Sequence, residues 1–230
     1  DLAKTQKFYV ADSTTRPYRD RFKRLFDIAF VIAAAPIALP LVGFMLLLAM
    51  LDGAKPFYSP RRIGKNGRIY RMVKIRSMVP NADQRLEAYL DANPEAREEW
   101  DSTQKLKNDP RITKIGKFLR KSSMDELPQL WNVFSGDMSL VGPRPERPTF
   151  YNKLEQEIPY FSERTYGVLP GITGLAQVNQ GYDTCIEDVR SKVGFDHSYA
   201  LSLSSISSWI KSDMYILLMT VKVMFFARGQ

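Results

Sequence analysis

One stretch near the start decides how this chain is organised: residues 28–51 read IAFVIAAAPIALPLVGFMLLLAML, 24 successive positions without a charged side chain. A helix needs about 20 apolar residues to cross the hydrocarbon core of a membrane. A signal peptide explains the run poorly, because the run is long and is followed by KPFY rather than by a small-residue cleavage site. The stretch therefore predicts a membrane anchor.

Two features favour a helix that enters the membrane and returns over a helix that spans it. Pro36 and Pro40 lie near the middle of the run, and each removes a backbone donor and clashes with the preceding turn, which predicts a kink or break. Both flanks are rich in cations, whereas a spanning helix normally has a Lys/Arg excess on one side only. These cations are Arg16, Arg19, Arg21, Lys23 and Arg24 before the run and Lys55, Arg61, Arg62, Lys65, Arg68 and Arg71 after it. We expect a re-entrant helix–break–helix over 23–54, after an N-terminal extension at 1–22; a spanning helix is the alternative.

The composition limits the chemistry of the rest. The chain has 33 Lys and Arg against 25 Asp and Glu, so its net charge of +8 favours polyanions such as nucleic acid, an anionic membrane surface or phosphorylated small molecules. Cys185 is the only cysteine and His197 the only histidine, so an intrachain disulfide is excluded and zinc sites or Ser-His-Asp catalysis are poorly supplied. Any metal should be a hard cation held by oxygen atoms.

Residues 55–230 predict one cytosolic catalytic domain of the α/β class, mostly helical, with amphipathic helices around a small β-hairpin. An Asn-Gly turn between short β-prone runs places the hairpin within 63–75. Residues 81–107 predict a pair of acidic helices, the second beginning at Pro94 after Asn93, which we interpret as a solvated face. The apolar segment near the C-terminus predicts a membrane-surface helix over 205–228, flanked by Trp209 and Tyr215; a buried core helix is the alternative.

A basic amphipathic segment, DPRITKIGKFLRK, occupies residues 109–121. Ile112, Ile115 and Leu119 share one helical face. The other positions carry Arg111, Lys114, Lys117, Arg120 and Lys121. Such a helix can lie on a membrane surface, point its end at phosphate groups, or simply be a solvated surface helix.

Two adjacent acids, Asp125 and Glu126, follow this segment in SSMDELPQLWN, residues 122–132. One interpretation is a capping box, with Ser123 as N-cap and Glu126 three residues later. Against it, Pro128 would then be the fifth helical residue, where its missing N–H is already felt. The other interpretation is a catalytic pair near cations and a hard metal. Arg144, between two prolines in VGPRPE, adds a stiffly held guanidinium suited to phosphate, or is a surface arginine on a rigid turn.

The order of these motifs resembles a known family. FKRLFD before the apolar run, the block from DPRITKIG through SSMDELPQLWNVFSGDMSLVGPRPE, and PGITGLAQVN together are similar to the bacterial sugar transferases, the monotopic phosphoglycosyl transferases. The resemblance extends from about Lys23 to the C-terminus.

The resemblance implies transfer of a sugar 1-phosphate from a UDP-sugar to undecaprenyl phosphate or another polyprenyl phosphate, with Mg²⁺, on the cytoplasmic face of the bacterial inner membrane, at the start of surface glycan synthesis. It makes Asp125 the nucleophile, with UMP as leaving group, and Glu126 an assistant at the metal or in proton transfer. Both acids are then the metal candidates. Arg120 and Arg144, with Lys121 and Arg111 nearby, are the candidate phosphate ligands.

The chain also departs from the family pattern and leaves alternatives open. The Ser-Pro of the family's membrane helix falls on Leu39 and Pro40, so the proline is kept without the serine. Gln177 and Asn179, after PGITG, are candidate contacts to nucleotide or sugar, with a polar loop as the alternative. Outside the family, a membrane-tethered nucleic-acid binder would not need Asp125, and we expect no nucleic-acid partner. A membrane-anchored, Mg²⁺-dependent phosphohydrolase with an aspartyl nucleophile would use water as acceptor.

Overall fold

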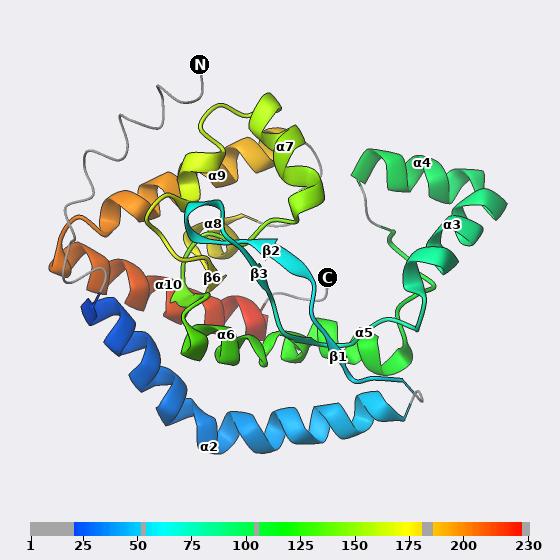
Figure 1. Ribbon diagram of the computed structural model, residues 1–230, viewed down its shortest axis with the longest axis horizontal. Coiled ribbons are helices and arrows are strands. Elements are labelled where there is room, and N and C mark those ends of the chain that lie inside the picture. The colour runs from blue at the N-terminus through cyan, green and yellow to red at the C-terminus, as the bar shows by residue number, and fades with distance from the viewer. Residues whose placement is uncertain (1–20, 52–53, 104–105, 181–185, 227–230) are drawn as a thin grey trace.

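The computed structural model of this protein describes residues 21–51, 54–103, 106–180 and 186–226. Within these ranges the chain is mostly helical, and its strands form three two-stranded sheets (Figure 1), so the prediction of a mostly helical chain with little sheet is confirmed. The α-helices are α2 (Lys23–Met50), α3 (Ala82–Ala92), α4 (Pro94–Thr103), α5 (Lys114–Lys121), α6 (Gln129–Ser135), α7 (Pro148–Glu157), α8 (Leu175–Asn179), α9 (Ile186–Ser202) and α10 (Ile206–Phe226). The strands are β1 (Phe57–Tyr58), β2 (Arg61–Ile63), β3 (Ile69–Arg71), β4 (Lys74–Ile75), β5 (Ser139–Val141) and β6 (Gly171–Thr173), and the 3₁₀ turns are η2 (Lys65–Gly67), η3 (Met124–Glu126) and η4 (Ser162–Thr165).

Helix α2 lies along the edge of the molecule and is bent near its middle (Figure 1). Pro36 and Pro40 are inside it, and the helical backbone continues through both, so this segment is one bent helix. Among the described residues it is the one helix long and apolar enough to cross a membrane, and only 11% of its most apolar window is buried. That exposure suits a lipid-facing helix, and the re-entrant topology over 23–54 stays a prediction.

The predicted hairpin is present. Strands β2 and β3 pair antiparallel, with Arg62 directly opposite Tyr70. The turn between them holds Asn66 at φ 57° and Gly67 at φ 77°, the left-handed conformations that an Asn-Gly pair adopts most readily. Strands β1 and β4 pair beyond it and continue the ribbon towards α5 (Figure 1).

The acidic pair of helices also follows the prediction. Helix α4 begins at Pro94, directly after Asn93, as the sequence indicates. Arg97 bonds Asp91 at 2.6 Å and lies 3.7 Å from Glu87, with all three side chains well exposed. Such exposed pairs contribute little to stability. Helices α3 and α4 project from one side of the molecule in Figure 1, which fits a solvated face.

The capping-box interpretation of the acids is wrong. Ser123 has a left-handed backbone, at φ 55°, and its side chain makes no capping bond. The acids instead lie in the short turn η3, and Pro128 is the residue before α6, where its missing N–H costs nothing.

The basic helix also starts later than its apolar spacing predicts. Thr113 caps α5 by accepting from the Gly116 N–H, and Ile112 lies outside the helix, bridged to Met78.

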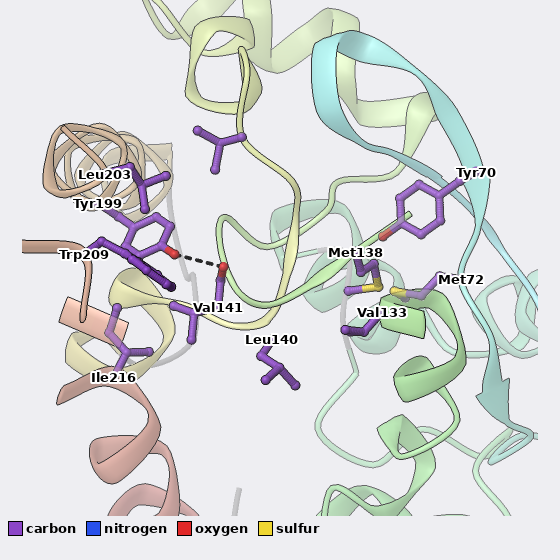
Figure 2. Packing of buried hydrophobic residues seen from close by; sticks show 11 residues of the cluster. Tyr70, Met72, Val133, Met138, Leu140, Val141, Tyr199, Leu203, Trp209 and Ile216 are labelled. Carbon is purple, nitrogen blue, oxygen red and sulfur yellow. Dashed lines mark hydrogen bonds between the residues drawn. The ribbon is translucent and has the colours of Figure 1, made fainter. Parts of the chain in front are cut away.

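The largest hydrophobic core joins the β5–β6 sheet to the hairpin, α6, α9 and α10 (Figure 2). Trp209 is in this core at 6% exposure, packed edge-on against Phe26 of α2. The prediction that Trp209 marks a membrane interface is therefore wrong. Helix α10 has two faces: Trp209 and Ile216 are buried, whereas Met214, Tyr215 and Leu218 are exposed. The end of the predicted segment, 227–228, lies outside the described residues.

Buried polar contacts fasten the N-terminal end of α2 to this core. Lys23 donates to Asp213 of α10 at 2.7 Å, with both side chains buried. Asp27 accepts from the Leu140 N–H of β5 at 3.1 Å. Arg24 donates to the carbonyl oxygens of Val133 and Phe134 at the end of α6. The FKRLFD motif thus docks the apolar helix onto the domain that carries the acids.

Candidate active site

Close backbone packing positions η3 beside β4. A Cβ atom added to Gly116 would lie 1.9 Å from the Ser77 carbonyl oxygen, so only glycine lets α5 approach the segment after β4 this closely. Arg120 reinforces the contact by donating from Nε to Ser77 Oγ at 2.8 Å. The chain then turns through η3, which brings Glu126 to Lys74 of β4.

Glu126 lies between two cations. Its Oε1 accepts from Lys74 Nζ at 2.6 Å and from Arg144 Nη2 at 3.2 Å. Burial alone would raise the pKa of Glu126, but the charges and hydrogen bonds of Arg144 and Lys74 together lower it to about 2. Glu126 is therefore ionised at neutral pH and is a fixed negative charge rather than a proton donor.

Asp125 is in a different environment. It is 8% exposed, and burial, with the neighbouring charge of Glu126, raises its pKa above the ordinary value of 3.8, while Lys74 and Arg120 oppose the rise. A buried carboxylate with little solvation is a stronger nucleophile and base than a solvated one. The two adjacent acids thus have separate properties: the pKa of Glu126 is lowered, whereas the pKa of Asp125 is raised.

Arg144 is held by the loop after β5. Arg164, itself buried, donates to the Arg144 carbonyl oxygen at 3.0 Å and to Asp196 at 2.7 Å. The flanking prolines, Pro143 and Pro145, further limit the backbone. Arg144 is 47% exposed, so its guanidinium can reach both Glu126 and a ligand above the site. These contacts hold the Arg144 backbone in place, and its role as a phosphate ligand stays a prediction.

Among the other predicted site residues, Arg120 influences the acids through its charge, which lowers the pKa of Asp125. Arg111 is buried and donates from Nε to Oδ1 and from Nη2 to Oδ2 of Asp109, with its guanidinium over the Trp100 ring. These contacts give Arg111 a structural role in binding α4 to the segment before α5. Lys121 is exposed at the end of α5.

Gln177 and Asn179 lie on α8 and bond to backbone carbonyl oxygens near them. Gln177 Nε2 donates to Ile172 at 3.2 Å, and Asn179 Nδ2 donates to Leu175 at 2.8 Å. In the part of the chain that the structure describes, neither side chain bonds to Asp125 or Glu126. They remain candidate contacts to a ligand rather than members of the cluster around the acids.

Sequence reasoning missed Lys74. Burial lowers the pKa of Lys74, and Glu126 opposes this shift, so the cation is a desolvated partner of the acids. It lies 52 residues before Glu126 along the chain. In the sequence, Lys74 is one of many cations and lies in a short β-prone run. Nothing in that pattern distinguishes it from a lysine on the surface.

Comparison with known proteins adds independent information. A family model described as "Bacterial sugar transferase" matches residues 18–227. The UDP-galactose-lipid carrier transferase of Erwinia amylovora is 41% identical over 201 residues, which are 87% of this chain and 40% of that protein. The undecaprenyl-phosphate galactose phosphotransferase of Salmonella typhimurium is 42% identical over 204 residues, again 40% of its length.

A third relative has nearly the same length as this chain. The exopolysaccharide production protein ExoY of Rhizobium meliloti is 36% identical over 230 residues, covering 96% of this chain and 94% of ExoY. The chain thus spans less than half of some relatives and almost all of another. Because the family model covers most of the chain and the relatives exceed 30% identity, the chain belongs to the bacterial sugar transferase family.

Proposed function

We propose that the chain is a membrane-bound phosphoglycosyl transferase that moves a sugar 1-phosphate from a UDP-sugar to undecaprenyl phosphate. The observation that carries the proposal is the pairing of buried Asp125 with an ionised Glu126 held between Lys74 and Arg144. The names of two relatives support the same substrate classes: a UDP-galactose-lipid carrier transferase in Erwinia amylovora and an undecaprenyl-phosphate galactose phosphotransferase in Salmonella typhimurium.

The reaction would proceed in two displacements on one phosphorus atom. A carboxylate oxygen of Asp125 attacks the phosphorus that bears the sugar, and the bond from this phosphorus to the bridging oxygen breaks, so that UMP leaves. An oxygen of the lipid phosphate then attacks the same phosphorus, and the bond to Asp125 breaks. Arg120, Arg144 and Lys74 would offset the phosphate charges in both steps, because positioning and charge stabilisation supply most of the catalysis in phosphoryl transfer. Neither displacement needs a proton from Glu126.

Mg²⁺ fits the residues present. Among the described residues, no three Asp, Glu, His or Cys side chains are grouped so that they could hold a metal. The candidate ligands at this site are therefore only two, the carboxylates of Asp125 and Glu126. Two carboxylates are enough for Mg²⁺, which keeps several waters and takes its remaining ligands from substrate phosphates. When bound, the ion would supply charge neutralisation at the diphosphate. Its ligands here would be Asp125 and Glu126.

The membrane arrangement is part of the proposal. Helix α2 would enter the bacterial inner membrane from the cytoplasmic face and return to it, bending near Pro36 and Pro40. Residues 55–230 would then stay in the cytoplasm, and the exposed apolar side chains of α10, such as Leu218, would lie at the lipid surface. The exposed apolar length of α2 and its docking through Lys23 support this placement.

The proposal is tested by incubating the purified protein with Mg²⁺ and a panel of UDP-sugars, with and without undecaprenyl phosphate. We expect continuous UMP release only when the lipid phosphate is present, and at most one UMP per protein molecule without it. Free sugar phosphate formed without lipid would identify a phosphohydrolase instead. No UMP with any donor would contradict the proposal.

Lys74→Met tests the cation that the sequence did not single out. Loss of Lys74 removes the largest cationic influence on Asp125, so the pKa of Asp125 rises further and less of the nucleophile is ionised. We expect the rate to fall about 100-fold and its acid limb to move to higher pH. The measurement is the pH profile of UMP release. Arg68→Met, at an exposed cation of the same hairpin, should leave both unchanged, and an unmoved acid limb in Lys74→Met would contradict the assigned role.

A further inference from the structure

Arg62 in β2 lies beside the loop that carries Arg144. The Ile63 N–H donates to the Glu146 carbonyl oxygen at 3.0 Å, which fixes β2 against residues 143–147. Arg62 is directly opposite Tyr70 in the hairpin, and side chains of directly opposed residues share one face of a β-ribbon. Tyr70 is buried in the core (Figure 2), so the Arg62 side chain points to the same inner face of the hairpin. Arg61, the residue before Arg62, is exposed on the other face.

The surroundings of Arg62 are positive. Burial lowers the pKa of Arg62, and the like charges of Arg147 and Arg144 lower it further, while Glu146 opposes them. The Glu146 carboxylate acts on Arg164 as well as on Arg62, since its Oε1 lies 3.5 Å from Arg164 Nη2. The Nε atom of Arg62 is buried and has no hydrogen-bond partner among the described residues. A cation that points inward among like charges is costly unless an anion offsets its charge.

An anionic ligand would offset that charge. Arg144 reaches Glu126 with Nη2 at 3.2 Å, so the cluster of arginines meets the acids through Arg144. Helix α7 begins at Pro148, immediately after Arg147, and the positive end of its dipole adds to the same potential. Guanidinium groups are suited to phosphate oxygens because they bind them through paired hydrogen bonds.

We propose that Arg62 and Arg147 form, together with Arg144, a phosphate subsite next to Asp125. The identity of its ligand rests on the proposed function. In a displacement on phosphorus the attacking and leaving oxygens are in line, so the phosphate that departs with the nucleotide and the lipid phosphate that arrives both lie opposite Asp125. One subsite therefore serves both, and it holds the phosphate group that does not become attached to the enzyme.

The test compares Arg62→Gln with Arg61→Gln, the exposed neighbour on the opposite face. We expect Arg62→Gln to weaken UMP binding about 10- to 100-fold, the effect of one charge-assisted phosphate contact, and Arg61→Gln to leave it within about twofold. The melting temperature of ligand-free Arg62→Gln should equal or exceed that of the wild type, because a like-charge repulsion is removed. Arg147→Gln, at an exposed position, repeats the binding measurement if Arg62→Gln does not fold.

The two sources of phosphate are separated by kinetics with UDP-sugar and with undecaprenyl phosphate in detergent micelles. A rise in KM for both substrates in Arg62→Gln supports one shared subsite. A rise for one substrate only would overturn the sharing. Unchanged UMP affinity with a lowered melting temperature would make Arg62 a structural cation and overturn the subsite. UMP binding that depends on Arg62, in a wild-type protein that transfers no sugar phosphate, would keep the subsite and contradict the proposed function alone.

Discussion

Asp125→Asn is expected to abolish sugar phosphate transfer, with a loss of at least about 10⁴-fold in rate, because the amide cannot form the covalent bond to phosphorus. The single UMP released per wild-type molecule in the absence of lipid should disappear as well. Mass spectrometry of the wild-type protein should detect a sugar phosphate on the peptide that contains Asp125. Asp83→Asn, at an exposed position on α3, should leave all three measurements unchanged. Turnover by Asp125→Asn would show that the nucleophile is assigned wrongly.

Loss of folding does not explain this expected inactivity. The pKa of Asp125 is raised in the folded protein by burial and by Glu126, so the folded state binds a proton at this position more tightly than the unfolded state does. The associated stability is fully present below the unfolded value of 3.8 and is lost as the pH rises through the raised folded value. At neutral pH the ionised carboxylate is therefore destabilising, and Asp125→Asn should melt at the same temperature as the wild type or higher.

The same shift sets the acid limb of the reaction. Asp125 attacks phosphorus only when it is ionised, so the rate of UMP release should fall with decreasing pH at values above 3.8. Glu126 does not contribute to this limb, since Lys74 and Arg144 keep its pKa at about 2 despite its burial. An acid limb at or below 3.8 would contradict the environment assigned to Asp125.

Local signals in the sequence were sufficient for several parts of the molecule. The uncharged run at 28–51 identifies α2, and the Asn-Gly pair identifies the hairpin, because each feature depends on residues adjacent along the chain. The acids could be identified as a pair for the same reason. Pro128 correctly argued against a capping box, since the rule that excludes proline from a helix interior is also local.

The partners of these residues could not be predicted, because they arise from packing between distant segments. Lys74 lies in β4, which pairs with β1, and it bonds to Glu126 across 52 residues, while Lys23 meets Asp213 across 190 residues. Trp209 was interpreted as an interfacial residue from its position at the edge of an apolar run. Its burial depends on Asp213 one helical turn later, which accepts from its indole N–H at 2.8 Å.

Asp213→Asn should have the largest effect on stability. The Asp213 carboxylate accepts from Lys23 Nζ at 2.7 Å, from the Tyr199 hydroxyl at 2.8 Å and from the Trp209 indole at 2.8 Å, and it is 2% exposed. Removal of its charge leaves the Lys23 ammonium buried without its ion-pair partner. Loss of one member of a buried pair costs roughly 3–5 kcal/mol. We expect a decrease of that size in the free energy of unfolding, measured by urea denaturation in detergent micelles.

A double variant shows whether the pair itself or the isolated charge determines this cost. Lys23→Met combined with Asp213→Leu removes both charges. This double variant should lose less free energy of unfolding than the sum of the losses in Lys23→Met alone and Asp213→Leu alone. Asp101→Asn, an exposed carboxylate on α4, should change the free energy of unfolding by less than about 0.5 kcal/mol. Additive single effects would mean that Lys23 and Asp213 stabilise the fold independently. If the double variant loses less stability than the sum of the single variants, the ion pair is the contact that binds α2 to α10. The adjacent Arg24 binds α2 to α6, the helix that begins three residues after Glu126.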